Sequence, residues 1–320
     1  MTWQKITLET PILARRRRGR PVHGWLAVDK PSGLTSTQVL SRVKRALDAE
    51  KAGHGGTLDP IATGVLPVAL GAATKTVSYA MNLLKTYEFE LIWGTATETD
   101  DSEGHIIETS LARPDKERIL SALPALTGDV EQVPPKYSAI KVGGQRAYSR
   151  ARRNQIVELE PRHVQVKRFE LIDSADADHS TFRVVCGKGT YVRALARDLG
   201  KMLGTCAHIC RLRRTQYGPF FAERSISLDK LEVLGHSAAD SEHLLPVSTV
   251  LDDIPALAVT EQEARRMCHG QPIALLPVAQ RTSATGLLQG ATVKALCGNN
   301  LIAVAKIGGG LLHPVKVLNH

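Results

Sequence analysis

Short apolar runs occur along this chain of 320 residues, some with the period of a strand and others with the period of a helix. Glycine, proline and charged residues separate them. Residues 24–28 and 181–186 have the composition of short strands, and residues 87–94 alternate polar and apolar side chains as a half-buried strand does. Residues 36–47 and 192–203 instead place their apolar side chains on one helical face. The mixture predicts a mixed α/β fold. No run approaches the roughly 18 apolar residues that a membrane span needs.

The pattern changes beyond Pro255. Thr260 and Glu263 have the spacing of a capping box, which predicts a short helix that Gly270 ends. Three short apolar runs separated by glycines follow, within residues 290–296, 301–307 and 312–318. This pattern of short apolar runs and glycines predicts a small, mostly β module over residues 255–320, closed as a barrel.

The formal net charge of +9 is unevenly distributed. Residues 136–214 carry a net charge of +10 and residues 264–320 contain six bases and no acid, whereas residues 36–135 sum to −5. Separate basic blocks predict surfaces for a polyanion, and nucleic acid is favoured over a membrane because no basic amphipathic helix stands out. The alternative is that mild basicity serves only solubility.

Two further features concern the N-terminus and the cellular compartment. Five arginines lie between residues 15 and 20, which predicts a flexible basic arm over residues 1–21. Five scattered cysteines, an odd number, predict a reducing cytoplasm without a disulfide framework.

Residues 52–67 are the segment richest in potential chemistry. Three glycines within residues 53–56 let the backbone approach a ligand closely, and His54 and Asp59 are the titratable side chains. A phosphate-binding Walker loop needs lysine after its last glycine, and Val65 follows Gly64, which argues against an NTPase. The spacing alone predicts a strained loop that presents an acid, or a glycine turn in which Asp59 and Pro60 form the turn pair.

The same segment, Gly-His-Gly-Gly-Thr-Leu-Asp-Pro-Ile-Ala-Thr-Gly-Val-Leu-Pro, resembles the catalytic motif of the TruB family, the bacterial tRNA pseudouridine-55 synthases. Other blocks resemble further motifs of that family in the same order: residues 28–36, 94–104, 134–141, 188–193 and 208–214. The resemblance implies a pseudouridine synthase catalytic domain over residues 22–250, built on a central, largely antiparallel sheet. Residues 255–320 are similar to the family's C-terminal PUA module, which is a small β-barrel.

The resemblance also implies a set of catalytic residues. Asp59 corresponds to the nucleophilic carboxylate, and Arg193 to a buried arginine that keeps it ionised. Asp101 matches an acid in the same arginine network. Tyr87 corresponds to the tyrosine that stacks on the target base, with a hydroxyl that assists proton removal at C5. From the residues alone, the favoured interpretation of Tyr87 is a strand tyrosine in the core.

A second set of residues is implied to bind substrate. His54 matches the residue that enters the space left by the flipped bases, and Lys30 a lysine that supports the active-site loop or contacts RNA. Tyr191 and Leu212 match positions in the substrate pocket. The expected phosphate contacts are Lys141, Arg213 and Arg214. Without the resemblance, His54 is interpreted as a turn histidine, and Tyr191 and Leu212 as core residues. The basic residues Lys141, Arg213 and Arg214 are then part of an exposed charged face.

The implied reaction isomerises uridine 55 in the T-loop of elongator tRNAs. It oxidises nothing and transfers no phosphate, so we expect no cofactor and no metal. Cys206, His208 and Cys210 lack further ligands at a zinc spacing. The expected partner is the tRNA T-arm, bound by a monomeric cytoplasmic enzyme without a membrane, guide RNA or protein partner. Two alternatives stay open: an RNA chaperone that refolds the tRNA elbow, alone or alongside catalysis, and a relative of the archaeal and eukaryotic guide-RNA enzymes.

Overall fold

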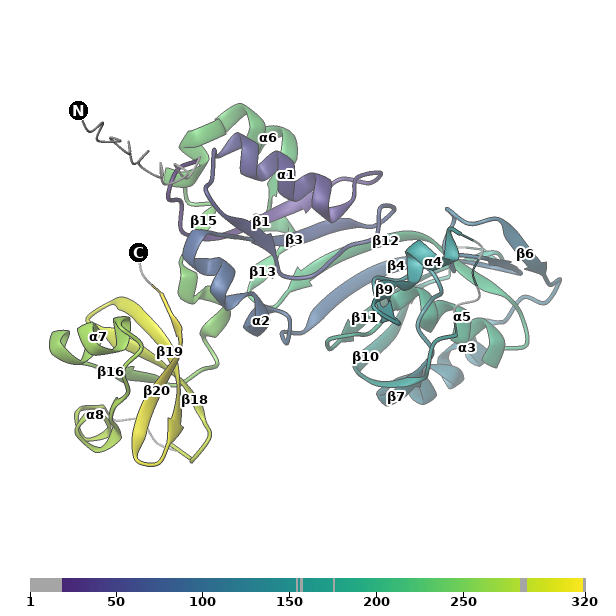
Figure 1. The fold of residues 1–320 in the computed structure, drawn as a ribbon. Helices are drawn as coiled ribbons and strands as arrows, with labels where there is room; N and C mark the ends of the chain where they lie inside the picture. The colour runs from purple at the N-terminus through teal and green to yellow at the C-terminus, as the bar shows by residue number, and fades with distance from the viewer. Residues whose placement is uncertain (1–18, 154, 156–157, 175, 283–286, 319–320) are drawn as a thin grey trace, which may run out of the picture.

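A computed structural model describes residues 19–318 except 154, 156–157, 175 and 283–286. It contains one large mixed sheet and a smaller curled sheet at the C-terminal end of the chain (Figure 1). Of the predicted basic arm at residues 1–21, residues 1–18 lie outside the described part of the chain. Arg20 forms an isolated bridge with Ala49, so backbone pairing begins earlier than the strand predicted at 24–28.

The large sheet has eleven strands and is mostly antiparallel, as the resemblance implies. Its main path runs in the order β14 (Ile226–Ser227), β1 (Gly24–Lys30), β3 (Thr63–Leu70), β12 (Ala207–Tyr217), β4 (Lys85–Trp93), β11 (His179–Cys186), β10 (Arg162–Asp173) and β7 (Gly128–Gln132). Three short strands pair beside this path, namely β2 (Ala52–His54) on β3, β13 (Phe220–Phe221) on β12 and β15 (Leu244–Leu245) on β1. The parallel pairs are β1 with β14 and β3 with β12.

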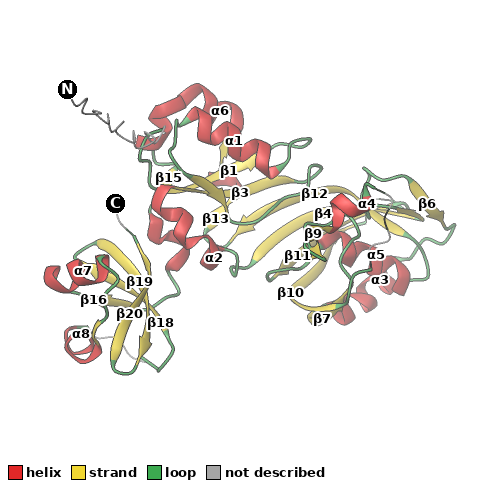
Figure 2. Cartoon of the chain, in the orientation of Figure 1, coloured by secondary structure: helices red, strands yellow, loops and turns green. Residues whose placement is uncertain are grey.

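Helices and two small ribbons complete the structure around this sheet and at the C-terminal end (Figure 2). The helices are α1 (Ser36–Ala46), α2 (Val77–Ala80), α3 (Lys116–Ala122), α4 (Ala147–Ala151), α5 (Val192–Met202), α6 (Leu228–Leu234), α7 (Glu261–Cys268) and α8 (Leu275–Arg281). The ribbons pair β5 (Thr95–Thr97) with β6 (Ile106–Thr109) and β8 (Lys141–Val142) with β9 (Gln145–Arg146).

Strands β1 and β3 are buried on both faces. Leu26 and Leu66 point into the main core, to which Val39 and Val43 of α1 also belong. Trp25, the neighbour of Leu26, belongs to a second apolar cluster on the opposite face of the sheet. Successive side chains of a strand point to opposite faces, so a strand covered on both sides is apolar almost throughout. This explains the continuous apolar run at residues 65–70.

The two helices predicted from apolar periodicity are confirmed as α1 and α5. At the start of α1, the Thr35 side chain accepts a hydrogen bond from the backbone N–H of Gln38, which satisfies one free donor of the first turn. Leu195 and Leu199 of α5 are buried as expected. Met202, expected to face inward, is exposed, whereas the next residue, Leu203, is buried.

The predicted β module is confirmed as a five-stranded sheet in the order β16 (Ala256–Ala258), β18 (Thr292–Cys297), β19 (Asn300–Gly308), β20 (Leu311–Val317) and β17 (Ile273–Ala274). The capping box of Thr260 and Glu263 opens α7 as predicted. This sheet packs against the large one: Leu301 and Val304 of β19 belong to the same apolar cluster as Trp25. None of the helices that the structure describes is long and apolar enough to cross a membrane.

The aromatic centre of the large sheet generates a stability prediction. Phe182 is fully buried, and its ring centroid lies 5.6 Å from those of both Phe89 and Phe169. Replacing Phe182 by Ala leaves a cavity, so we expect Phe182→Ala to lower the free energy of unfolding by about 3–5 kcal/mol in urea titrations. Phe221→Ala is the matched control because Phe221 is 38% exposed. Equal losses in the two variants would contradict this account.

Candidate active site

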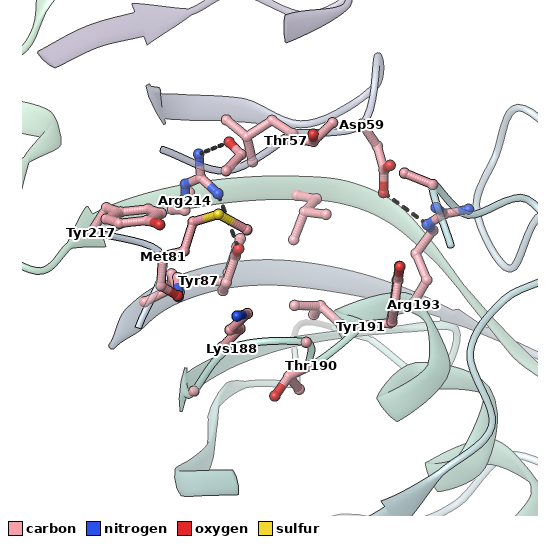
Figure 3. A pocket seen from close by; sticks show the side chains of 18 of the residues that line it. Thr57, Asp59, Met81, Tyr87, Lys188, Thr190, Tyr191, Arg193, Arg214 and Tyr217 are labelled. Carbon is pink, nitrogen blue, oxygen red and sulfur yellow. Dashed lines mark hydrogen bonds and ion pairs between the residues drawn. The ribbon is translucent and has the colours of Figure 1, made fainter. Parts of the chain in front are cut away.

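A pocket of about 290 Å³ lies beside the glycine-rich loop, between strands β4 and β12 and the start of α5 (Figure 3). Six of the residues predicted from the sequence line it: Asp59, Tyr87, Tyr191, Arg193, Leu212 and Arg214. The fold therefore gathers side chains from distant parts of the chain around one cavity. Figure 3 shows Asp59 and Arg193 at one end of it, and Arg214 and Tyr217 at the other.

Asp59 and Arg193 form an ion pair at that end of the pocket. The distance from Arg193 Nε to Asp59 Oδ2 is 2.9 Å. The Arg193 side chain is 4% exposed and that of Asp59 is 33% exposed, so the carboxylate keeps a face toward the pocket opening. A guanidinium this deeply buried needs compensating charge, and the Asp59 carboxylate supplies part of it.

The two terminal nitrogens of the Arg193 guanidinium have partners of their own. Nη1 lies 3.3 Å from Asp101 Oδ2 and donates to Thr99 O at 2.7 Å, while Nη2 donates to Tyr137 O at 3.0 Å. Asp101 is buried beside it and does not line the pocket. The placement of Asp101 in the arginine network agrees with the prediction, and its geometry is that of a positioning residue.

The loop that carries Asp59 is held from β1 and α1. Ser36 of α1 accepts a hydrogen bond from Leu58 N at 2.8 Å and donates to Leu58 O at 3.0 Å. Lys30 of β1 is fully buried and donates to the carbonyls of Pro31, Leu34 and Pro60. Of the two roles predicted for Lys30, loop support fits this geometry. Contact with RNA does not, because the ammonium is inaccessible.

Arg214 is not placed to contact phosphate, as the sequence analysis expected. Its side chain is 1% exposed, and it donates to the carbonyls of Val65 and Gly56 at 2.7 and 3.2 Å. Its Nη1 also donates to the Tyr87 hydroxyl at 3.3 Å. Strands β3 and β12 run in parallel here, and a Cβ on Gly64 would lie 2.2 Å from the Arg214 carbonyl oxygen. The carbonyls of Val65 and Gly56 thus hold the Arg214 side chain inside the protein, away from solvent.

Tyr87 and Tyr191 present their rings to the same cavity (Figure 3). Burial raises the pKa of both phenols, so both hydroxyls are protonated at neutral pH. The backbone of Tyr191 is braced by Gln132, whose amide accepts from Tyr191 N at 2.8 Å and donates to Tyr191 O at 3.1 Å. Leu212 of β12 is buried and supplies an apolar part of the pocket lining.

His54 lies at the end of β2 and does not line the pocket. Its ring is partly buried, and its Nδ1 has no hydrogen-bond partner among the described residues. Burial, with a smaller contribution from the charge of Arg214, lowers the pKa of His54, so that the imidazole is neutral at pH 7.

The two remaining predicted phosphate contacts lie away from the ion pair. Lys141 is exposed on the small ribbon of β8 and β9. Arg213 forms two hydrogen bonds with the carboxylate of Asp29, at 3.0 and 2.9 Å, and its side chain is partly exposed. Both stay predictions as phosphate contacts.

Among the pocket residues that the sequence analysis did not single out are Lys85 and Tyr217. Lys85 is buried, donates to Met81 O at 2.7 Å and lies 4.8 Å from the ring centroid of Tyr217. Burial lowers the pKa of Lys85 from 10.5 to about 8. A lysine in an amphipathic strand ordinarily faces solvent, so nothing in the local pattern marks this one as buried.

In the segment around His208, which has a zinc-like spacing, the side chains contact backbone carbonyls. His208 Nδ1 lies 2.9 Å from Thr95 O, and Cys210 Sγ donates to Glu90 O at 3.4 Å. Among the described residues, no group of three or more His, Cys, Asp or Glu side chains has an arrangement that could hold a metal ion.

The chemistry available at this site is that of an oriented carboxylate facing a cavity lined by the rings of Tyr87, Tyr191 and Tyr217. Such a group can act as a nucleophile toward carbon, and protonated phenols and apolar side chains can hold a planar base beside it.

Known structures share this fold. The structure of a Cbf5–Nop10–Gar1 complex aligns with a TM-score of 0.73 and 25% identity, over 93% of this chain and 85% of that one. An H/ACA RNP bound to a substrate RNA containing 2′-deoxyuridine aligns with a TM-score of 0.71 and 24% identity, over 96% of this chain and 92% of that one. The model described as "TruB family pseudouridylate synthase (N terminal domain)" matches residues 44–192. Fold, site and family model together define a pseudouridylate synthase, which is an isomerase.

Near full-length relatives identify the family more closely. The tRNA pseudouridine synthase B of Rhodospirillum rubrum is 53% identical over 96% of this chain and all of its own length. That of Caulobacter vibrioides is 51% identical over 95% of this chain and 99% of its own. A "tRNA pseudouridylate synthase B C-terminal domain" model matches residues 193–252. The chain belongs to the TruB family, and its activity is the conversion of uridine in tRNA to pseudouridine.

The buried ammonium of Lys30 generates a pH prediction. Burial lowers the pKa of Lys30 to about 8, although the charges of Asp59 and Glu103 oppose the shift. In the unfolded chain the pKa is near 10.5, so between these pH values the unfolded state binds more protons. The contribution of Lys30 to the free energy of unfolding therefore rises as the pH increases through this range.

The measurement is the difference in unfolding free energy between wild type and Lys30→Met, from urea titrations at about pH 7.5 and about pH 9.5. We expect a larger difference at the higher pH. Lys44→Met is the control, because Lys44 is exposed on α1. A difference for Lys30→Met that stays constant or shrinks as the pH rises would contradict the assignment.

Proposed function

We propose that this enzyme isomerises uridine 55 in the T-loop of elongator tRNAs, with Asp59 as the catalytic carboxylate. The observation that carries the proposal is the ion pair between Arg193 Nε and Asp59 Oδ2 at the pocket. It leaves Asp59 partly exposed, charged and oriented, which is what a nucleophile beneath a ribose requires.

The reaction breaks the bond between uracil N1 and ribose C1′ and joins C1′ to uracil C5. The hydrogen at C5 is lost and N1 gains one, so no oxidant or phosphate donor takes part. Asp59 attacks C1′, adds to C6 or assists a glycal intermediate. Each route needs an ionised carboxylate within reach of the ribose and the base, and Arg193 holds it in that state.

Tyr87 serves as the surface on which the extruded base stacks. It lies in the pocket beside Leu212, and an aromatic face is the natural receiver of a base that has left its helix. Burial raises the pKa of its phenol, which disfavours the phenolate that would be needed to remove the C5 proton directly. We therefore assign Tyr87 to stacking and leave its hydroxyl as the acceptor for Arg214.

The remaining predicted residues are proposed to bind the tRNA around the pocket. His54 is neutral and lies on a short strand beside the loop, where it can occupy the space that flipped T-loop bases leave. Lys141 and Arg213 contact phosphates, and residues 255–320 form a PUA-like RNA-binding unit beside a catalytic domain of residues 22–250. The enzyme acts in the cytoplasm as a monomer, without a guide RNA or protein partner.

Asp59→Asn tests the catalytic assignment. The amide keeps the shape of the side chain but removes its charge, so we expect loss of pseudouridine formation with tRNA binding retained. Purified protein is incubated with unmodified tRNA, and pseudouridine is mapped by carbodiimide treatment and primer extension. Asp48→Asn is the control, because Asp48 is exposed and its positive φ of 45° suits asparagine equally well.

Wild-type protein that forms pseudouridine elsewhere than the T-loop uridine would refute the choice of position 55. A fully active Asp59→Asn variant would refute the role of Asp59. The same variant separates catalysis from an RNA-chaperone activity, because refolding of the tRNA elbow needs binding but not the carboxylate.

Salt dependence tests the proposed electrostatic contribution. Binding through several lysine and arginine contacts to phosphate should weaken at least about tenfold between about 50 and about 200 mM salt. The single-turnover rate with saturating enzyme should change by less than about twofold, because the tRNA stays bound at saturation and the ion pair at Asp59 is partly buried. Filter binding and rapid quench measure the two quantities. Affinity that is insensitive to salt would contradict the assignment of these charges.

A further inference from the structure

We propose that Tyr217 is a positioning residue of this active site: from β12 it holds the Gly55–Gly56 segment and thereby sets the position of Asp59. The inference rests on the proposed role of Asp59. It concerns a side chain that belongs to none of the sequence motifs and that meets the catalytic loop only in the folded protein.

Tyr217 contacts the loop in two ways. Its side chain is fully buried, and its hydroxyl donates a hydrogen bond to the carbonyl of Gly55. Its ring lies directly against Gly56: a Cβ added there would be 3.2 Å from Tyr217 Cε2. Gly56 has a φ of +152°, so the chain turns against the ring in a conformation that glycine adopts readily.

Two cations lie close to the Tyr217 ring. Lys85 Nζ lies 4.8 Å and Arg214 Cζ 4.9 Å from its centroid, distances at which a positive charge is attracted to an aromatic face. Arg214 also donates to the carbonyl of Gly56 at 3.2 Å. Two successive carbonyls of the loop, those of Gly55 and Gly56, are thus bound by two nearby residues of one strand.

This attachment completes the support of the catalytic loop. Lys30 and Ser36 hold its far part, at Pro60 and Leu58, and Tyr217 with Arg214 holds its near part. Glycine has more backbone freedom than any other residue, so a Gly-Gly segment needs an external contact to define its path. Displacing a reacting group by about 1 Å can slow a reaction by roughly 10²-fold, and an unheld Gly55–Gly56 segment permits such a displacement of Asp59.

The Tyr217 hydroxyl is a permanent donor rather than a participant in proton transfer. Burial raises its pKa, so the phenol stays protonated at neutral pH. Because its one proton is committed to Gly55, the hydroxyl has none to donate to a substrate. We therefore expect its loss to change the rate of the chemical step and to leave tRNA binding unchanged.

The test compares Tyr217→Phe and Tyr217→Leu with wild type, using tRNA labelled with tritium at uracil C5. Pseudouridine formation releases that tritium, wherever in the tRNA it occurs. We expect Tyr217→Phe to lower kcat and the single-turnover rate about tenfold, with KM and Kd for tRNA within about twofold of wild type. Tyr217→Leu also removes the ring close to the two cations and should be slower still. All rates are measured well below each melting temperature.

Tyr79→Phe is the matched control, because Tyr79 packs against the same apolar cluster as Tyr217 and is outside the pocket. It should retain the wild-type rate. A wild-type single-turnover rate for Tyr217→Phe would overturn the inference, and so would a defect confined to KM. Asp59→Asn is assayed in parallel: if that variant stays active, the role of Asp59 fails, whatever the result for Tyr217.

Discussion

The buried guanidinium of Arg193 is the group on which the geometry of the active site depends. A cation that is almost inaccessible to water is stable only if its charge is balanced and hydrogen bonds compensate for the lost water. Its partners come from separate segments: Asp59 from the glycine-rich loop, Thr99 and Asp101 from the turn after β5, and Tyr137 from a loop beyond β7. Neutralising one charge therefore brings these segments together around the carboxylate.

A second arginine organises the opposite end of the pocket by a different means. Among the described residues Arg214 forms no ion pair with a carboxylate. It donates to backbone carbonyls and lies over the rings of Tyr87 and Tyr217. Carbonyl dipoles and aromatic faces disperse its charge without a competing acid near Asp59. The difference between the two arginines leaves Asp59 as the carboxylate that lines this pocket.

Several elements were predictable because their signals are local. The apolar spacing of α1 and the alternation within β4 depend on residues close together in the sequence, and both elements were found at the predicted segments. The same local reasoning failed for Arg214. A basic pair in a strand suggests an exposed face, and only the parallel approach of β3, remote in sequence, buries the second arginine of the pair.

The sequence by itself determined the mixed strand and helix content, the change of texture beyond Pro255, and the ordered motifs by which the chain resembles the TruB family. The tertiary structure decided which charges are buried, which lysine supports the loop instead of contacting RNA, and that Tyr217 meets Gly55. The physical reason is that periodicity and capping are properties of neighbouring residues. Desolvation and charge pairing depend on which distant segments pack together, and this packing cannot be inferred from neighbouring residues.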